Sequence, residues 1–378
     1  MDKKKKIAIV ASNLFRIEAD VGRGPEVFVY ILTNQLAKNI HRNNIQFTVF
    51  SSGDSRVPFP VESVDYKSSL DDINIGIKYH KLMELSLLSK AFSQQDRFEL
   101  YHINIGNGEI TLPFLPFVKK PIIVTLHSSF FSGELQKFYK LYAHYSNIYY
   151  VSISNNQRTK IPELNYIKTI YHGIDTNNFI FSDASGDSIM WAGRASPQKG
   201  LDVVLKVANT IKKETMLYIL DKEENKSWVD KLIESNKTDK IKIEYRVDRK
   251  TLISQYCNAK LFLFPIQWEE PFGLVMVESM ACGTPVVAYA RGSVPEVIKD
   301  GETGFIVNSS PDDVRGDWIV KKTGIDGLCE AVEKIYSIPE EQYKQMRRNC
   351  RAQVEKNFTV ERMVEDYEKV YEQILNKT

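Results

Sequence analysis

The chain has few cysteines, and their spacing fits neither a metal site nor a disulfide framework. Cys257, Cys282, Cys329 and Cys350 form no C-x-x-C pair, and no histidine lies near them at the spacing that zinc sites use. We therefore expect neither zinc nor disulfides, which agrees with a reducing cytoplasm.

The sequence also lacks any apolar run of the roughly 20 residues that a membrane-spanning helix requires. The lysines at positions 3 to 6 lead straight into a short apolar stretch, without the longer apolar segment of a secretion signal. These absences predict a cytoplasmic protein that is not exported.

What is present is the composition of a folded globular protein, with 378 residues, of which 43% are hydrophobic and 26% charged. A chain of this length suits two domains of about 150 to 200 residues each. The net charge of +2 is uneven, because residues 1–172 carry 21 basic against 15 acidic residues. A solvated surface explains so small an excess, and peripheral contact of this basic half with an anionic membrane is the alternative. Nothing points to nucleic acid.

Residues 1–172 alternate between short apolar strands and helical stretches. We expect strands at 7–10, 47–50, 100–103, 121–126 and 149–154, and helices at 26–39, 76–95 and 134–145. Gly22 and Gly24 precede the first helix, where glycine lets the backbone approach a ligand, but they do not form the G-x-G-x-x-G of dinucleotide sites. His127 follows a strand at the edge where open α/β sheets bind ligands.

A second series of strands and helices follows an aperiodic linker at 179–188. We expect strands at 189–193, 216–220, 241–245, 262–264, 286–288 and 304–307, and helices at 325–337, 339–356 and 359–376. This order predicts an α/β protein with two doubly wound domains and a helical tail.

Two loops of the second half carry charges that suit a single ligand. Arg194 and Lys199 follow one strand, and a guanidinium and an ammonium around a turn suit a diphosphate, although two solvated loop cations are the plainer alternative. Glu270 and Glu278 follow another strand, and carboxylates accept hydrogen bonds from sugar hydroxyls. Because both strands belong to one parallel sheet, we expect the two loops at the same edge.

In these motifs the chain resembles the retaining glycosyltransferases of family 4, which have the GT-B fold. The motifs are G-R-x-x-P-x-K-G at 193–200, E-x7-E at 270–278 and A-C-G-T-P-V-V-A at 281–288, with looser matches at 22–24, 125–127 and 172–175. The resemblance implies two Rossmann-like domains that face each other across a cleft. Residues 1–172 would form the acceptor side and 173–358 the donor side, with the helix at 359–378 crossing back to the first domain.

The resemblance also implies roles for individual residues. Arg194 and Lys199 would hold the diphosphate of a nucleotide sugar, Glu270 would contact the transferred sugar and Glu278 the ribose. His127 would touch the sugar from the other domain. We expect His127, Arg194, Lys199 and Glu270 to act in catalysis.

The remaining donor-binding positions act mainly through the backbone. Phe272, Gly273 and Leu274 would offer N–H groups to phosphate or sugar, Gly24 would close over the donor, and Arg246 and Val247 would lie against the base. The family usually has paired glycines where Arg23 separates two here, so Arg23 could instead contact an acceptor or a phosphate.

The implied activity is the transfer of a hexose or N-acetylhexosamine from a nucleotide sugar, with UDP favoured over GDP, to a saccharide or lipid-linked acceptor in cell-surface polysaccharide biosynthesis. The sequence has no D-x-D motif, so we expect neither a metal nor a cofactor. The alternatives are a glycosidase with paired carboxylates, a nucleotide-sugar epimerase of the same fold and a non-catalytic nucleotide-sugar-binding subunit. The cationic loop beside the glutamates favours the transferase.

Overall fold

The computed structural model describes residues 4–19, 24–39, 44–129, 132–221 and 225–377. The chain divides into two compact units, one made of Met1–His172 with Val360–Thr378 and the other of Gly173–Thr359. We call them unit 1 and unit 2. Gly22 and Arg23 of the predicted glycine loop lie outside the described residues.

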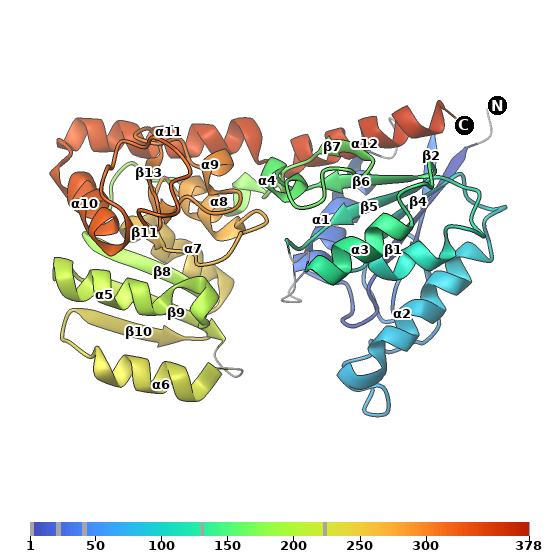
Figure 1. The fold of residues 1–378 in the computed structure, drawn as a ribbon, viewed down its shortest axis with the longest axis horizontal. Coiled ribbons are helices and arrows are strands. Elements are labelled where there is room, and N and C mark those ends of the chain that lie inside the picture. The colour runs from blue at the N-terminus through green and yellow to red at the C-terminus, as the bar shows by residue number, and fades with distance from the viewer. Residues whose placement is uncertain (1–3, 20–23, 40–43, 130–131, 222–224, 378) are drawn as a thin grey trace. The chain divides into compact units, whose positions relative to one another are not determined.

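Unit 1 is built on a parallel sheet of seven strands in the order β3-β2-β1-β4-β5-β6-β7 (Figure 1). The strands are β1 (Lys5–Ala11), β2 (Ile45–Phe50), β3 (Val61–Glu62), β4 (Leu100–Asn104), β5 (Ile122–Leu126), β6 (Ile148–Ser152) and β7 (Tyr166–Thr169). The central strands β1, β4 and β5 are almost wholly buried, as a sheet covered on both faces requires.

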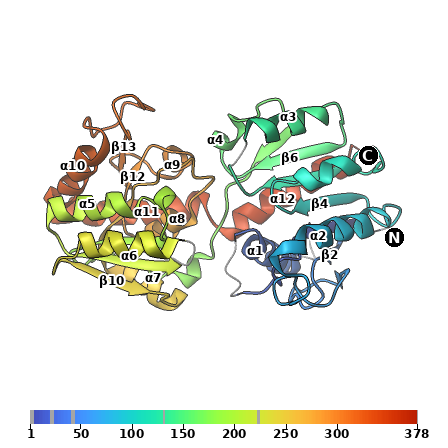
Figure 2. The same cartoon turned by 60° about the horizontal axis from the view of Figure 1, so that its bottom comes forward.

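Helices cover both faces of this sheet (Figure 2). The helices are α1 (Gly24–Asn39), α2 (Gly76–Phe92), α3 (Gly133–Leu141), α4 (Asn155–Arg158) and α12 (Val360–Leu375), with a 3₁₀ helix at Glu109–Phe114. One apolar core joins α1 and α12 to the sheet, and a second core joins α2 to its other face. The last helix of the chain is therefore part of unit 1.

Unit 2 has a parallel sheet of six strands in the order β10-β9-β8-β11-β12-β13. The strands are β8 (Ser188–Arg194), β9 (Thr215–Asp221), β10 (Ile241–Tyr245), β11 (Ala259–Phe264), β12 (Val286–Tyr289) and β13 (Gly304–Val307). The chain order reverses between β8 and β11. Such a reversal leaves a crevice at the carboxyl ends of the two strands, where doubly wound folds bind ligands.

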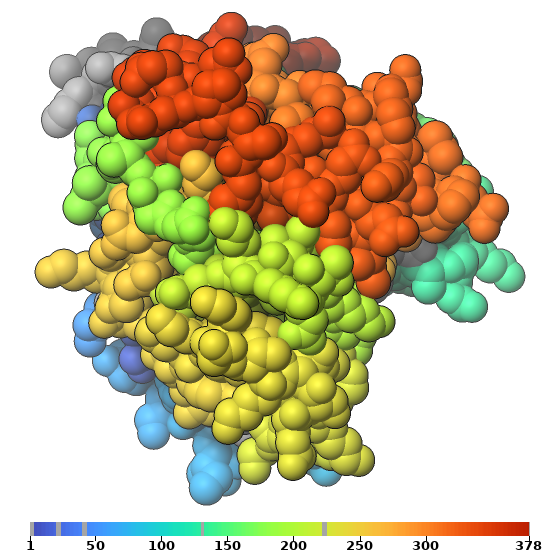
Figure 3. Space-filling model, turned by 90° about the vertical axis from the view of Figure 1, so that its left-hand side faces the viewer, coloured from blue at the N-terminus to red at the C-terminus, as the bar shows by residue number. Residues whose placement is uncertain are grey.

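The helices of unit 2 enclose this sheet. They are α5 (Leu201–Ile211), α6 (Lys226–Ser235), α7 (Arg249–Asn258), α8 (Leu274–Ala281), α9 (Val294–Val297), α10 (Gly324–Ser337) and α11 (Glu340–Asn357), with 3₁₀ turns at Thr176–Asn178 and Pro197–Lys199. Figure 3 shows the face of the unit that carries α5, α6 and α10. In the described part of the chain, no helix is both long and apolar enough to span a bilayer.

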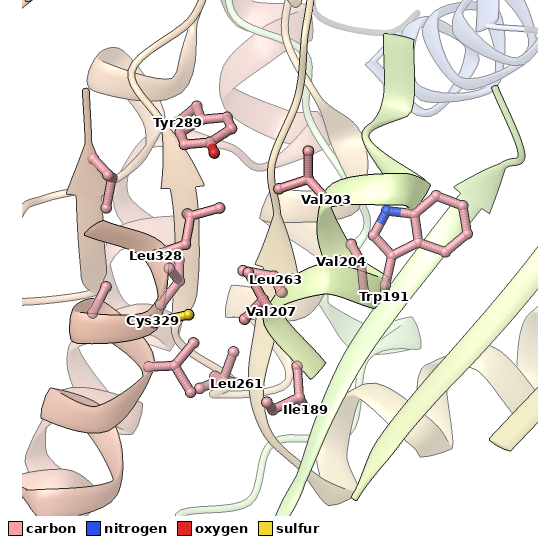
Figure 4. Packing of buried hydrophobic residues seen from close by; sticks show 14 of the residues in the cluster. Ile189, Trp191, Val203, Val204, Val207, Leu261, Leu263, Tyr289, Leu328 and Cys329 are labelled. Atoms are coloured by element: carbon pink, nitrogen blue, oxygen red, sulfur yellow. The ribbon is translucent and has the colours of Figure 1, made fainter. Parts of the chain in front are cut away.

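The core of unit 2 lies directly beneath the crevice. Leu261 and Leu263 of β11 and Trp191 of β8 pack against Val204 and other apolar residues of α5 (Figure 4). The indole N–H of Trp191 reaches out of this core and donates to the carbonyl oxygen of Lys199 at 3.2 Å. The core therefore supports the loop that carries the predicted cations.

Candidate active site

The loop after β8 is folded tightly against the loop after β11. Gly200 has a φ of +71°, and a Cβ at this position would collide with the carbonyl oxygen of Pro265. The backbone N–H of Gln267 also donates to the carbonyl oxygen of Gln198 at 2.8 Å. The predicted cationic and acidic loops are therefore neighbours at one edge of the sheet.

This contact brings together Lys199 and Glu270. The Nζ atom of Lys199 lies 2.7 Å from Oε2 of Glu270, and their side chains are 21% and 10% exposed. The indole N–H of Trp268 donates to the same carboxylate oxygen at 3.0 Å, and the ammonium lies 5.1 Å from the centre of the Trp268 ring. Arg194, at the end of β8, is exposed to solvent.

A group of ionic contacts that sequence reasoning missed holds the neighbouring Glu269. Arg315 lies 2.7 Å from Oε1 of Glu269 and Arg291 lies 3.7 Å from it, while the backbone N–H of Gly292 donates to Oε2 at 2.8 Å. Hydrogen bonding by Arg315 holds the pKa of Asp313 below its ordinary value. We call Glu269, Arg291, Asp313 and Arg315 the Glu269 clamp.

The clamp stands beside the beginning of α8. The Ser293 backbone N–H donates to the Glu270 carbonyl oxygen at 2.9 Å, and its hydroxyl donates to the Phe272 carbonyl oxygen at 2.7 Å. A Cβ at Gly292 would collide with the Glu270 backbone, so only glycine permits this approach. These contacts fix the backbone that leads through Gly273 to Leu274, the first residue of the helix.

Glu278 lies one turn further along α8 and is half-buried. Burial raises the pKa of Glu278 above its ordinary value of 4.5, and the nearby Arg249 acts in the opposite direction. The Nη2 atom of Arg249 lies 3.3 Å from Oε1 of Glu278. The ion pair therefore favours the charged form of Glu278, whereas burial favours its neutral form.

The predicted base-contacting residues follow β10. Arg246 is exposed and has a φ of +52°, and its backbone N–H donates to the carbonyl oxygen of Ile219 at 2.9 Å. Val247 is half-buried. The positive φ is uncommon for a residue with a side chain, and the bond to β9 maintains it.

The predicted residues of unit 1 lie at the carboxyl edge of its own sheet. Gly24 is the first residue of α1, and Phe28 of the same helix packs edge-on against His127 at 5.0 Å between ring centres. His127 follows β5, donates from Nε2 to Oδ1 of Asn104 at 3.1 Å and stacks on His172 at 6.0 Å. Burial, together with the two neighbouring histidines, holds the pKa of His127 well below 6.5. At neutral pH its Nδ1 atom is therefore a hydrogen-bond acceptor.

No group of three His, Cys, Asp or Glu side chains that could hold a metal ion occurs among the residues that the structure describes.

Comparison with known proteins places a family domain on unit 2. Residues 181–353 match the family model described as "Glycosyl transferases group 1". The chain is 37% identical over 123 residues to an uncharacterised 41.2 kDa protein in the cps region of Klebsiella pneumoniae, which covers 32% of each chain. It is 31% identical over 170 residues to a D-inositol 3-phosphate glycosyltransferase of Mycobacterium sp. (strain KMS), which covers 40% of this chain and 37% of the relative. The matched segments thus span about a third of these relatives.

Solved structures match over nearly the whole chain. Sucrose-phosphate synthase from Thermosynechococcus elongatus superposes with a TM-score of 0.75 at 19% identity, over 99% of this chain and 100% of that one. Anabaena HepE in complex with UDP and glucose gives 0.70 at 15% identity, over 98% and 100%. The predicted fold class and the resemblance to glycosyltransferases are confirmed, and the family domain supports a transferase.

Proposed function

We propose that this chain, which carries a glycosyl transferases group 1 domain at residues 181–353, moves a hexose or an N-acetylhexosamine from a UDP-sugar to a saccharide or lipid-linked acceptor. The transfer retains the configuration of the anomeric carbon and needs no metal ion. We assign the reaction to the synthesis of cell-surface polysaccharide in the cytoplasm.

The pairing of Lys199 with Glu270 is the observation that carries this proposal. The ammonium suits a phosphate and the carboxylate suits sugar hydroxyls, and their 2.7 Å separation puts both within reach of one ligand. A ligand that carries both a diphosphate and a sugar would replace the ion pair. Its diphosphate would contact the ammonium of Lys199, and its sugar would contact the carboxylate of Glu270. A phosphate alone or a glycan alone would leave one of the two charges unpaired, which is costly at a largely buried site.

The positive groups around Lys199 suit a departing nucleoside diphosphate. As the bond from the anomeric carbon to the diphosphate oxygen breaks, the leaving UDP gains negative charge. Arg194, Lys199 and the N–H groups at Phe272, Gly273 and Leu274 would stabilise that charge at the beginning of α8. Because these groups perform the task that a bridging metal performs elsewhere, we propose a metal-independent reaction.

We propose that configuration is retained because the acceptor hydroxyl attacks the anomeric carbon on the face that UDP leaves, with its proton passing to the departing diphosphate. Glu270 is held by Lys199 and Trp268, so we assign it to contact with the sugar and not to covalent attack. The reaction then passes through an oxocarbenium-like ion pair. In unit 1, the unprotonated Nδ1 of His127 would accept a hydrogen bond from the sugar, and the backbone at Gly24 would approach the donor.

The choice of UDP draws support from the similar HepE structure, which contains UDP and glucose. Glu278 would accept hydrogen bonds from the ribose, and the backbone at Arg246 and Val247 would face the base. We assign the acceptor to surface polysaccharide synthesis, and one similar protein is named for its place in a cps region.

A thermal-shift screen of the purified chain against UDP-, GDP- and ADP-sugars, with and without EDTA, tests this donor assignment. A UDP-sugar at about 100 times its Kd should raise the melting temperature by roughly 5 °C or more, and EDTA should not change the shift. Lys199→Met should abolish it. A shift with GDP-sugars alone would reject UDP, and a shift lost in EDTA would reject metal independence.

A further inference from the structure

The loop before α2 and the first turns of α2 expose an unusual number of large apolar side chains. Ile73 is 98% exposed, Ile77 63% and Leu82 60%, and Leu70, Tyr79 and Leu85 are exposed beside them. The described part of the chain has fourteen exposed large apolar side chains, and six of them therefore lie together in this one short segment. We call these six the α2 surface.

Only the second half of α2 is anchored in unit 1. Leu87, Leu88, Ala91 and Phe92 are buried, whereas none of residues 76–83 is buried. In Figure 1 the helix runs away from the sheet, and the loop that precedes it lies at the lowest point of the unit. The α2 surface therefore lies at the end of a projection. A projection can contact a flat, deformable partner more readily than a groove can.

Three lysines lie in the same segment of the chain as these apolar side chains. Lys67, Lys78 and Lys81 are all exposed, and the ammonium of Lys78 lies 4.9 Å from the centre of the Tyr79 ring. A long lysine side chain can lie along apolar groups while its charge stays in water or among anions. Apolar residues flanked by lysines are typical of segments that enter the interface of an anionic membrane.

The same segment holds three acidic residues, Asp71, Asp72 and Glu84, and Asp72 accepts a hydrogen bond from the backbone N–H of Asn74 at 2.8 Å. Asp71 lies 3.3 Å from Nη1 of Arg16. Glu84 is buried and accepts hydrogen bonds from Ser12 at 2.6 Å and from Lys81 at 2.8 Å. These contacts offset part of the negative charge that would oppose an anionic partner.

We propose that unit 1 docks on a membrane containing anionic lipids through the α2 surface, with its apolar side chains among the acyl chains and Lys67 and Lys78 at the headgroups. The inference rests on the proposed function for its setting, because docking would bring unit 1 to a lipid-linked acceptor.

Flotation of the full chain with vesicles tests the docking. Wild type should float with vesicles of phosphatidylcholine and phosphatidylglycerol, and less with phosphatidylcholine alone or at high salt. Ile77→Asn with Leu82→Asn should lower vesicle binding by roughly tenfold or more for each side chain replaced. Phe117→Asn is the matched control, since Phe117 is 74% exposed in the same unit but lies outside the α2 surface.

Three outcomes would overturn the proposal: no flotation of wild type, equal flotation of the double variant, or a concentration-dependent dimer that the double variant abolishes. The dimer would assign the surface to a second copy of the chain. Circular dichroism and the melting temperature establish that the variants fold. Flotation needs neither donor nor turnover, so its failure leaves the transferase proposal intact, and loss of transfer with normal flotation leaves the docking intact.

Discussion

The ammonium of Lys199 donates a hydrogen bond to the carboxylate of Glu270 across two loops that lie 71 residues apart in the chain, with Nζ 2.7 Å from Oε2. Both side chains are largely buried, and Trp268 donates to the same oxygen. Removing either charge leaves the other without its partner in a poorly solvated place. The two residues therefore form one unit at the crevice between β8 and β11.

Replacing Lys199 and Glu270 one at a time should distinguish the role of each residue. Lys199→Met should weaken the binding of UDP itself, because the diphosphate loses its cation. Glu270→Gln should bind UDP at least as tightly as wild type, since UDP lacks the transferred sugar and no longer leaves a buried carboxylate unpaired, yet turnover of the UDP-sugar should fall by about 10² to 10³. Calorimetry with UDP and a UDP-release assay measure the two effects. Lys206→Met, on the exposed side of α5, is the control and should match wild type in both. Wild-type turnover in Glu270→Gln would refute the assigned role.

The Glu269 clamp should position Glu270 and the beginning of α8 without touching the donor. Arg315→Met should lower kcat by roughly tenfold to a hundredfold, because small displacements of Glu270 misalign the sugar, while the Kd for UDP stays unchanged. Arg315→Lys should recover part of the loss. Since Arg315 and Glu269 contact each other directly at 2.7 Å, the losses caused by Arg315→Met and Glu269→Gln should be less than additive in the double variant. Two fully additive losses would show that the clamp is not a unit.

Donor binding should weaken on acidification because of Glu278. Its pKa is raised by burial, so as the pH falls towards that raised value the carboxylate becomes neutral and accepts ribose hydroxyls less well. Titration of donor affinity from neutral to mildly acidic pH should show this loss, and Glu278→Gln should bind weakly with a flat profile. Arg249→Met should move the midpoint to higher pH, because the arginine favours the charged form. The same profile in wild type and Glu278→Gln would contradict the assignment.

The buried His102 should make unit 1 sensitive to acid. Burial lowers the pKa of His102 to about 3, and it contacts Tyr371 of α12 and Thr125 of β5 at 2.8 Å each. Below pH 6.5, the ordinary pKa of histidine, His102 takes up a proton in the unfolded chain but stays neutral in the folded chain. The unfolding free energy should therefore fall as the pH drops from 6.5 towards 3, by at most about 1.4 kcal/mol per pH unit for this group.

Urea denaturation at a series of pH values measures this contribution. His102→Asn should reduce the pH slope of the unfolding free energy by up to one proton. His144→Asn, on the exposed surface of the same unit, is the control and should keep the slope of wild type. An unchanged slope in His102→Asn would mean that His102 is protonated alike in both states.

The sequence is a good guide to the fold where strands are buried on both faces. Leu261–Phe264 of β11 reads as a continuous apolar run, which only a covered strand permits. The strands β3 and β7 escaped prediction because they are short, only partly buried and at the sheet edges, so their residues carry no clear apolar pattern. Helix α7 was also missed, although Asp248 caps it by accepting from the Thr251 N–H at 2.7 Å, a signal that the sequence contains.

Part of the candidate site could also be predicted, because it depends on the geometry of the parallel sheet. Parallel strands place their carboxyl ends at one edge, so the neighbourhood of Lys199 and Glu270 follows from the order of elements alone. The ion pair with Arg315 does not, because Glu269 and Arg315 are 46 residues apart and the loop between β13 and α10 has no periodic pattern. Long-range contacts between irregular segments depend on packing that spacing cannot encode.

Turnover of UDP-sugars by the purified chain distinguishes a transferase from a binding subunit and from an epimerase. The full chain is incubated in EDTA with a panel of UDP-sugars and a mixture of saccharide and lipid extracts, and UDP release and the anomeric configuration of the product are followed by NMR. We expect UDP release from at least one donor, a product with retained configuration, and loss of both in Glu270→Gln. Saturable donor binding without release, or conversion of the donor to an isomer without free UDP, would contradict it, the first pointing to a binding subunit and the second to an epimerase.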